Sequence, residues 1–235
     1  MLISGDIKIA YEEAGPATPL GTVVLVHGGT TDMRLWEHQF RALSERHRVI
    51  RYDWRGHGRS GDAAGEVCHH EDLLAVMDAL EVERAALVGN SMGGAYATEA
   101  ALAAPSRVAA LALISSGLAG HRWPQEMLDQ ARERVHGSVP ADRLAHYRAG
   151  TAGHVDPADV RAMAQAHTLW QTAGPGRGRD ALSDEVWGSA VEMCGLVFER
   201  SWSGPRSTEH HLTPLERPTE VTDALTAFLA TVFTA

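Results

Sequence analysis

The sequence predicts an α/β protein with a mostly parallel sheet and helices on both faces. In the first half of the chain, short apolar runs alternate with segments whose apolar residues recur at helical spacing. Polar residues follow several of these runs, and the connections between the runs are short. Strand–helix–strand units of this kind form parallel sheets with right-handed crossovers, and their functional groups gather at the carboxyl ends of the strands.

Five strands and three helices are expected in this part of the chain. Residues 7–13 alternate apolar and polar side chains, which indicates a half-exposed strand that ends at the Gly15-Pro16 turn. Residues 22–26 form a continuous apolar run, the pattern of a strand buried on both faces. Three more strands are expected, at residues 48–52, 85–88 and 108–115. Helical spacing predicts the intervening helices, at residues 35–46, 72–80 and in the alanine-rich run 96–104.

The alternation stops at Gly117, and helix-like segments follow to about Pro205. We interpret residues 117–205 as a helical cap inserted between two parts of the core, residues 1–116 and 206–235. Four of the six tryptophans lie in this cap. They either line an apolar substrate cavity or form the core of the cap itself. These tryptophans are Trp123, Trp170, Trp187 and Trp202.

Ser91 lies in the sequence Gly89-Asn90-Ser91-Met92-Gly93, between a predicted strand and a predicted helix. A G-x-S-x-G pattern in this context is a nucleophile elbow, because the tight turn raises the serine hydroxyl above the sheet at the helix N-terminus. Glycine suits positions 89 and 93, where a side chain would crowd the neighbouring strand and helix. The alternative is an ordinary serine that caps a helix.

Together these features resemble the α/β-hydrolase family. The segments that carry the resemblance are the elbow, His27-Gly28-Gly29 after the first buried strand, Asp53–Ser60 after the next strand, and His211 followed by Leu215-Glu216-Arg217-Pro218. The resemblance covers residues 1–117 and 208–235 and implies the α/β-hydrolase fold. Asp32–Trp36 is also similar to a segment of enol-lactonases. The motifs are more specific for the fold than for one reaction, because this fold hosts many chemistries.

The resemblance implies roles for four residues. Ser91 would be the nucleophile, and His211 would be the base that accepts and returns its proton, since imidazole titrates near neutral pH. The backbone N–H groups of Met92 and Gly29 would form the oxyanion hole. The expected reaction is hydrolysis of a small carboxylic ester, lactone or thioester through an acyl-serine intermediate. The expected partner is therefore a small apolar ester-like substrate.

The sequence departs from the family just before His211. Family members usually have two further strands there, the first of which supplies the acid of the catalytic triad. Residues 201–210 leave no room for either, so these C-terminal strands of the sheet are expected to be missing. Residues 186–198 have helical spacing, although residues 195–198 could instead form a short strand. Only weak candidates remain for the acid: Glu199, Glu209 and Asp184.

Two consequences follow from the missing strands. A catalytic histidine without its carboxylate loses control of its tautomer, so the activity is expected to be impaired. Residues 108–115 would become the edge of the sheet, and an apolar edge is open to pairing. We therefore expect either a homodimer through this edge or a cap segment that covers it.

Two other functions remain open. The elbow also resembles that of carbon–carbon bond hydrolases of the same fold, although these usually carry Gly-Pro-Gly in the oxyanion loop, where this chain has Thr30-Thr31-Asp32. The missing acid favours, instead, a non-catalytic protein that binds a small ligand. Intact Ser91, Gly29 and His211 favour the enzyme.

The remaining conspicuous residues are interpreted as structural. Asp53 and His57 precede the elbow, whereas the family order is serine, acid, histidine, so they are expected to hold their glycine-rich turn together. His27 is expected to be structural as well. Neither the histidines nor the two cysteines, Cys68 and Cys194, have a familiar metal-ligand spacing, so no metal and no other cofactor is expected.

Composition limits the partners and the compartment. The net charge is −9 and the arginines are scattered, which argues against nucleic acid and against an anionic membrane. The first residues do not have the pattern of a secretory signal, and no run approaches about eighteen apolar residues. Two widely separated cysteines suit a reducing compartment. A cytoplasmic protein is therefore expected.

Overall fold

The chain forms two compact units. A computed structural model describes residues 2–4, 7–62, 67–117, 124–172, 178–203 and 218–233. The first unit comprises Met1–Ala119 and Glu209–Ala235, and the second is Gly120–Thr208. That the second unit acts as a cap stays a prediction.

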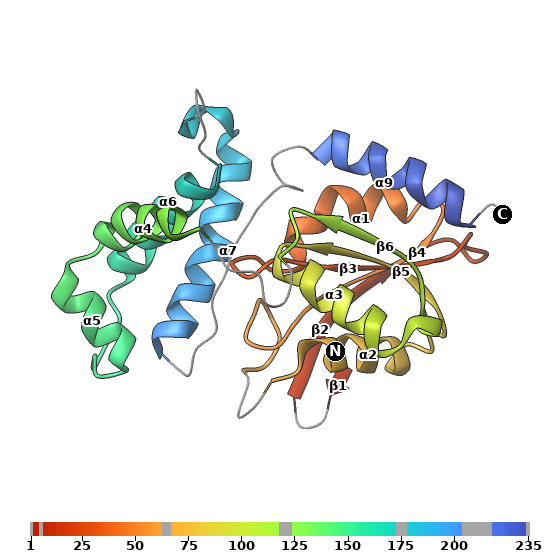
Figure 1. Cartoon of the computed structure of the whole chain (residues 1–235), viewed down its shortest axis with the longest axis horizontal. Helices are drawn as coiled ribbons and strands as arrows, with labels where there is room; N and C mark the ends of the chain where they lie inside the picture. Colours follow the sequence, from red (N-terminus) through yellow and green to blue (C-terminus); the bar gives the residue numbers. More distant parts are fainter. Residues whose placement is uncertain are drawn as a thin grey trace. The chain divides into compact units, whose positions relative to one another are not determined.

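The first unit is built on a six-stranded sheet (Figure 1). Its strands, in spatial order, are β1 (Leu2–Ser4), β2 (Ile7–Ala14), β4 (Arg48–Asp53), β3 (Thr22–Val26), β5 (Ala85–Asn90) and β6 (Val108–Ile114). β3 pairs in parallel with β4 and β5, and β5 pairs in parallel with β6. β2 is antiparallel to both of its neighbours, β1 and β4. The mostly parallel α/β sheet is therefore confirmed, with β1 as a short strand that the sequence analysis missed.

Helices cover both faces of this sheet, as predicted. The helices of the first unit are η1 (Met33–Trp36) and η2 (Pro105–Arg107), both 3-10 helices, α1 (Glu37–Leu43), α2 (His69–Ala79), α3 (Met92–Ala103) and α9 (Pro218–Phe233). α1 and α9 pack together on one face, and α2 and α3 pack together on the other (Figure 1). Asp32 caps η1, because its carboxylate accepts the N–H of Arg34 at 2.9 Å. The predicted helix over residues 35–46 thus starts earlier, as a 3-10 turn, and ends sooner.

The core lies around the central strands. Every residue of β5 is buried, and so is every residue of β3 after Thr22. This burial agrees with the continuous apolar run that predicted a strand covered on both faces. The main core cluster joins these strands to β4, α2 and α3 through fully buried side chains that include Val24, Val26, Ile50, Leu73, Met77 and Leu87.

β6 is the last strand of the sheet in the part of the chain that the structure describes. Its side chains are half-buried rather than buried, and Leu113 is 43% exposed. All regular elements described after Gly117 are helical, whereas residues 204–217 lie outside the described residues. A homodimer through this edge stays a prediction, and the mass of the protein in solution would test it.

The second unit is helical. It comprises α4 (Gln125–Arg134), η3 (His136–Ser138), α5 (Ala141–Ala149), α6 (Pro157–Thr172), η4 (Arg179–Ala181) and α7 (Asp184–Ser203). α6 packs against α7. α7 is helical throughout, so the alternative of a short strand over residues 195–198 is wrong. Among the described helices of both units, none combines the length and apolar character needed to cross a membrane.

The tryptophans of the second unit differ in their surroundings. Trp202 is buried, stacks on Tyr147 with ring centroids 4.8 Å apart, and belongs to the core of this unit. Trp170 packs against the same cluster. Trp187 lies under the Arg179 guanidinium, 4.7 Å from it. Trp202 and Trp170 therefore support the alternative in which tryptophans form the unit's own core, while Trp123 lies outside the described residues.

Candidate active site

The turn between β5 and α3 has the geometry of a nucleophile elbow. Ser91 connects the two elements with φ 53° and ψ −119°, a strained conformation for a residue with a side chain. A capping serine would have an extended backbone and a side chain that accepts a helix N–H. Ser91 has neither, since its side chain makes no capping hydrogen bond. The alternative of an ordinary capping serine is therefore wrong.

The glycines of the elbow allow three backbones to approach closely. A Cβ on Gly93 would come closer than 3.0 Å to the carbonyl oxygens of His27 and Val26, at the end of β3. A Cβ on Gly89 would lie 2.5 Å from the carbonyl oxygen of Gly93. The start of α3 therefore rests directly on the end of β3, and any side chain at these positions would push them apart.

This close approach places the His27–Thr31 loop beside Ser91. In the parallel pairing of β3 and β5, Val26 is the partner of Gly89, so Gly28 comes level with Ser91 just beyond the paired residues. Met92 is the first residue of α3, and the first N–H groups of a helix have no acceptor within it. The structure thus brings Ser91, Met92 and the loop that carries Gly29 together at the carboxyl ends of neighbouring strands.

Side chains brace this loop. The Thr31 hydroxyl accepts the N–H of Gly28 at 3.1 Å and lies 3.0 Å from the Gly28 carbonyl oxygen. His57 Nε2 lies 2.7 Å from the Gly29 carbonyl oxygen. The peptide groups on both sides of Gly29 are therefore held in place. This bracing role of Thr31 was not predicted, although threonine hydroxyls commonly bond to backbone groups three or four residues earlier in the chain.

His27 and His57 belong to a buried aromatic cluster. The Trp54 ring stacks on both, with centroids 5.0 Å from His27 and 3.9 Å from His57, and the two histidine rings are 5.4 Å apart. Burial, reinforced by the nearby His57, holds the pKa of His27 well below its ordinary value, so its ring stays neutral. Protonated at Nδ1, it donates to the Gly28 carbonyl oxygen at 2.8 Å, whereas in the other tautomer Nδ1 accepts the Trp54 indole N–H at 3.0 Å. Both arrangements agree with the structural role expected for His27.

Asp53 holds the glycine-rich turn after β4. Its carboxylate accepts the backbone N–H of Met33 at 2.8 Å and that of Arg59 at 2.7 Å. Burial raises the pKa of Asp53 to about 6, against the effect of these two hydrogen bonds. Gly58 has φ +48° and contacts the carboxylate so closely that a Cβ would overlap it. The structural roles predicted for Asp53 and His57 fit these contacts.

The other predicted site residues lie outside the described residues or in the second unit. His211 and the candidate acid Glu209 lie outside the described residues, as do Leu215–Arg217. Glu199 and Asp184 belong to α7 in the second unit. Asp184 is fully exposed at the start of that helix, where it pairs with Arg179. The roles of all four residues stay predictions.

Comparisons with known proteins point to one fold. A family model described as alpha/beta hydrolase fold matches residues 21–154. The chain is 40% identical over 114 residues to a putative carbamate hydrolase RutD of Azorhizobium caulinodans, a match that covers 47% of this chain and 42% of that protein. It is 32% identical over 142 residues to 3-oxoadipate enol-lactonase 1 of Acinetobacter baylyi, covering 60% of this chain and 51% of the relative. These matches span about half the length of the curated relatives.

A solved structure agrees over nearly the whole chain. The enol-lactonase from Burkholderia xenovorans superposes with a TM-score of 0.70 at 20% identity, and the match covers 96% of this chain and 98% of that one. At this identity the likeness concerns the fold.

Proposed function

Because this chain belongs to the alpha/beta hydrolase fold family, we propose that it is a serine hydrolase that cleaves a small carboxylic ester, lactone or thioester. The observation that carries the proposal is the backbone of Ser91, strained at φ 53° between β5 and α3. Such strain in a residue other than glycine concentrates at functional sites. The similarity to an enol-lactonase supports a substrate with an ester or lactone carbonyl group.

In the proposed reaction, the Ser91 hydroxyl oxygen attacks the carbonyl carbon of the substrate while His211 accepts the hydroxyl proton. The bond to the alcohol or thiol then breaks, and the leaving group takes that proton from His211. A water molecule attacks the resulting acyl-serine by the same route, which releases the carboxylic acid and restores Ser91. The role of His211 rests on its position in the family motif.

The N–H groups of Met92 and Gly29 would stabilise the oxyanion of each tetrahedral intermediate. The bracing of the His27–Thr31 loop supports this role, because a donor that is already held in place needs no reorganisation during the reaction. Loss of one such donor costs about 3–4 kcal/mol of transition-state stabilisation. Activity would still be slow without an acid that orients His211, since in serine proteases the loss of that acid lowers turnover by about ten-thousandfold.

Labelling of the nucleophile tests the proposal. A fluorophosphonate probe should attach to one serine, Ser91, and p-nitrophenyl esters of short acids should show a burst followed by slow turnover. Ser91→Ala should abolish both signals. Ser44→Ala is the matched control, because this serine lies at the end of α1, where its hydroxyl only caps the Arg41 carbonyl at 2.9 Å. Unchanged turnover in Ser91→Ala would remove this residue from the mechanism.

Two alternatives predict different results in the same assay. A carbon–carbon bond hydrolase would turn over a ring-cleavage diketone faster than an ester, but Thr30-Thr31-Asp32 stands where such enzymes usually carry Gly-Pro-Gly. A non-catalytic ligand-binding protein would give neither a burst nor probe labelling. The strained backbone of Ser91 favours the enzyme over this second alternative, because binding alone does not require it.

A further inference from the structure

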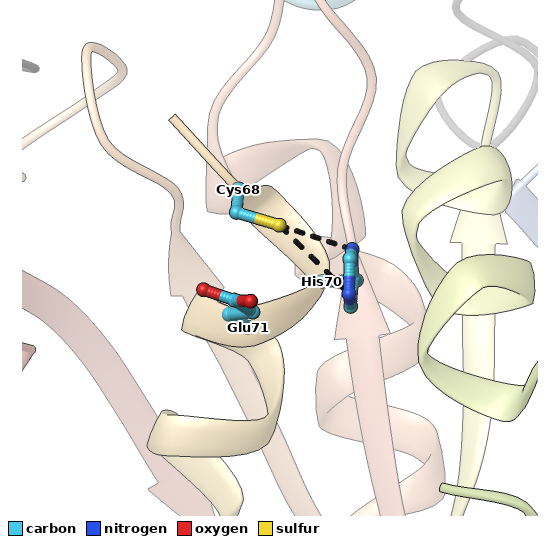
Figure 2. A group of neighbouring side chains, drawn as sticks. All are labelled: Cys68, His70 and Glu71. Atoms are coloured by element: carbon cyan, nitrogen blue, oxygen red, sulfur yellow. Dashed lines mark hydrogen bonds between the residues drawn. The ribbon is translucent and has the colours of Figure 1, made fainter. Parts of the chain in front are cut away.

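The N-terminus of α2 gathers three potential metal ligands of different chemistry. Cys68 precedes the helix as its N-cap residue, and His70 and Glu71 lie in its first turn. Their ligand atoms, one from each side chain, all lie within 4.8 Å of one another. Figure 2 shows the Cys68 sulfur pointing toward the His70 ring, with Glu71 beside them. A thiol, an imidazole and a carboxylate are the three ligand types that Zn²⁺ takes in proteins.

We propose that Cys68, His70 and Glu71 form a binding site for a thiophilic divalent cation, best suited to Zn²⁺, with Glu99 as the residue that orients His70. The site is separate from the proposed hydrolase chemistry and does not depend on it. The fourth coordination position would be taken by water.

The distances fit a tetrahedral ion. Zinc–sulfur bonds of about 2.3 Å and zinc–nitrogen bonds of about 2.0–2.1 Å place the two ligand atoms roughly 3.5 Å apart in a tetrahedral site. Cys68 Sγ lies 3.4 Å from Nδ1 and 3.8 Å from Nε2 of His70. Either nitrogen can therefore share an ion with the sulfur after a small ring movement. Glu71 is exposed, so its flexible side chain can close the remaining distance.

Glu99 selects between the two nitrogens. This residue lies on α3, which packs against α2, and its Oε2 is 3.4 Å from His70 Nδ1. A histidine that ligates a metal commonly donates its other ring N–H to a carboxylate, which fixes its tautomer and orientation. With Nδ1 held by Glu99, Nε2 remains for the ion. The ion would then join the N-terminus of α2 to α3.

The charges also favour a cation. The carboxylates of Glu71 and Glu99 lie beside the Cys68–His70 pair, so a thiolate alone would add a negative charge to a site that is already negative. A divalent ion reverses this balance: the S–H proton leaves for solvent, the sulfur–metal bond forms, and two positive charges enter the site. The Arg55 guanidinium is already paired with Asp72.

Cobalt titration tests the site directly. Metal-stripped, tag-free protein should bind one Co²⁺ per chain, with a thiolate-to-cobalt charge-transfer band and the visible bands of a tetrahedral ion, and Zn²⁺ should displace it. Cys68→Ser should lose the charge-transfer band. Cys194→Ser should keep it, because Cys194 is a buried thiol in the second unit. Glu99→Gln should weaken the affinity for the metal by about 10- to 100-fold.

The outcomes are unambiguous. A wild-type protein without the charge-transfer band at stoichiometric Co²⁺ would overturn the proposal, and so would a band that persists in Cys68→Ser. Thermal melting of each variant without metal verifies that a lost signal reflects a lost ligand rather than unfolding. Fluorophosphonate labelling of Ser91 should be the same with and without the metal-site substitutions, so failure of this site and failure of the proposed hydrolase are distinguishable.

Discussion

Replacing Gly93 with alanine should destabilise the protein although it adds only one methyl group. The new Cβ would come closer than 3.0 Å to the carbonyl oxygens of His27 and Val26, and both are backbone atoms that cannot rotate away. Overpacking of this kind costs about 1–3 kcal/mol, and we expect the upper end because backbone must move. Alanine regains about 1 kcal/mol through its helix propensity. The free energy of unfolding should therefore fall by roughly 2 kcal/mol.

The matched control is Gly188→Ala in α7. Gly188 is exposed within a helix, and a Cβ there would meet nothing within 4 Å. Without a steric cost, the substitution should stabilise the protein by about 0.5–1 kcal/mol. Urea unfolding followed by circular dichroism measures both changes, and fluorophosphonate labelling of Ser91 should slow only in Gly93→Ala. A Gly93→Ala protein as stable as the wild type would show that the contact between α3 and β3 is not tight, and the reasoning about the elbow would fail.

Three further results are expected. His57→Ala removes the brace on the Gly29 carbonyl and should lower kcat/KM for p-nitrophenyl esters by about 10- to 100-fold through a misplaced N–H donor; equal kcat/KM would contradict the bracing role. The melting temperature should fall as well, because the buried ring stacks on Trp54. Burial lowers the pKa of His27, so below about pH 6.5 the unfolded chain takes up a proton at this residue and the folded protein does not. The free energy of unfolding should therefore fall as the pH drops below about 6.5. It should fall less steeply in His27→Gln. Trp202→Ala should cost about 3–5 kcal/mol in urea unfolding, whereas Trp187→Ala should cost under about 1 kcal/mol, and similar values would refute the core placement of Trp202.

The main features of the sheet could be predicted because they depend on local patterns. The run Val23–Val26 is apolar throughout and fully buried, the pattern of a strand covered on both faces. The elbow could also be predicted from a local pattern, the glycines on both sides of Ser91. A side chain at either glycine would fill the space that the neighbouring backbone occupies. β1 escaped notice because three residues are too few to show an alternating pattern.

The contacts that involve distant residues could not be predicted. His57 lies 28 residues from Gly29, and nothing in the local sequence indicates that its ring reaches that carbonyl. Glu99 meets His70 only because α2 and α3 pack together. For the tryptophans, helical spacing indicates an inward-facing side but not what lies there. His211 depends on family resemblance alone, since its position relative to Ser91 lies outside the described residues.

The crowding around the elbow has a consequence for laboratory evolution of this protein. Libraries that vary Gly89 or Gly93 should yield almost no folded clones, because every larger residue meets main-chain atoms. Gly137, Gly153 and Gly188 in the helical unit face open space and should accept many residues. A library would therefore keep the most folded clones if its diversity were placed at these glycines, with the turn that presents the serine left untouched.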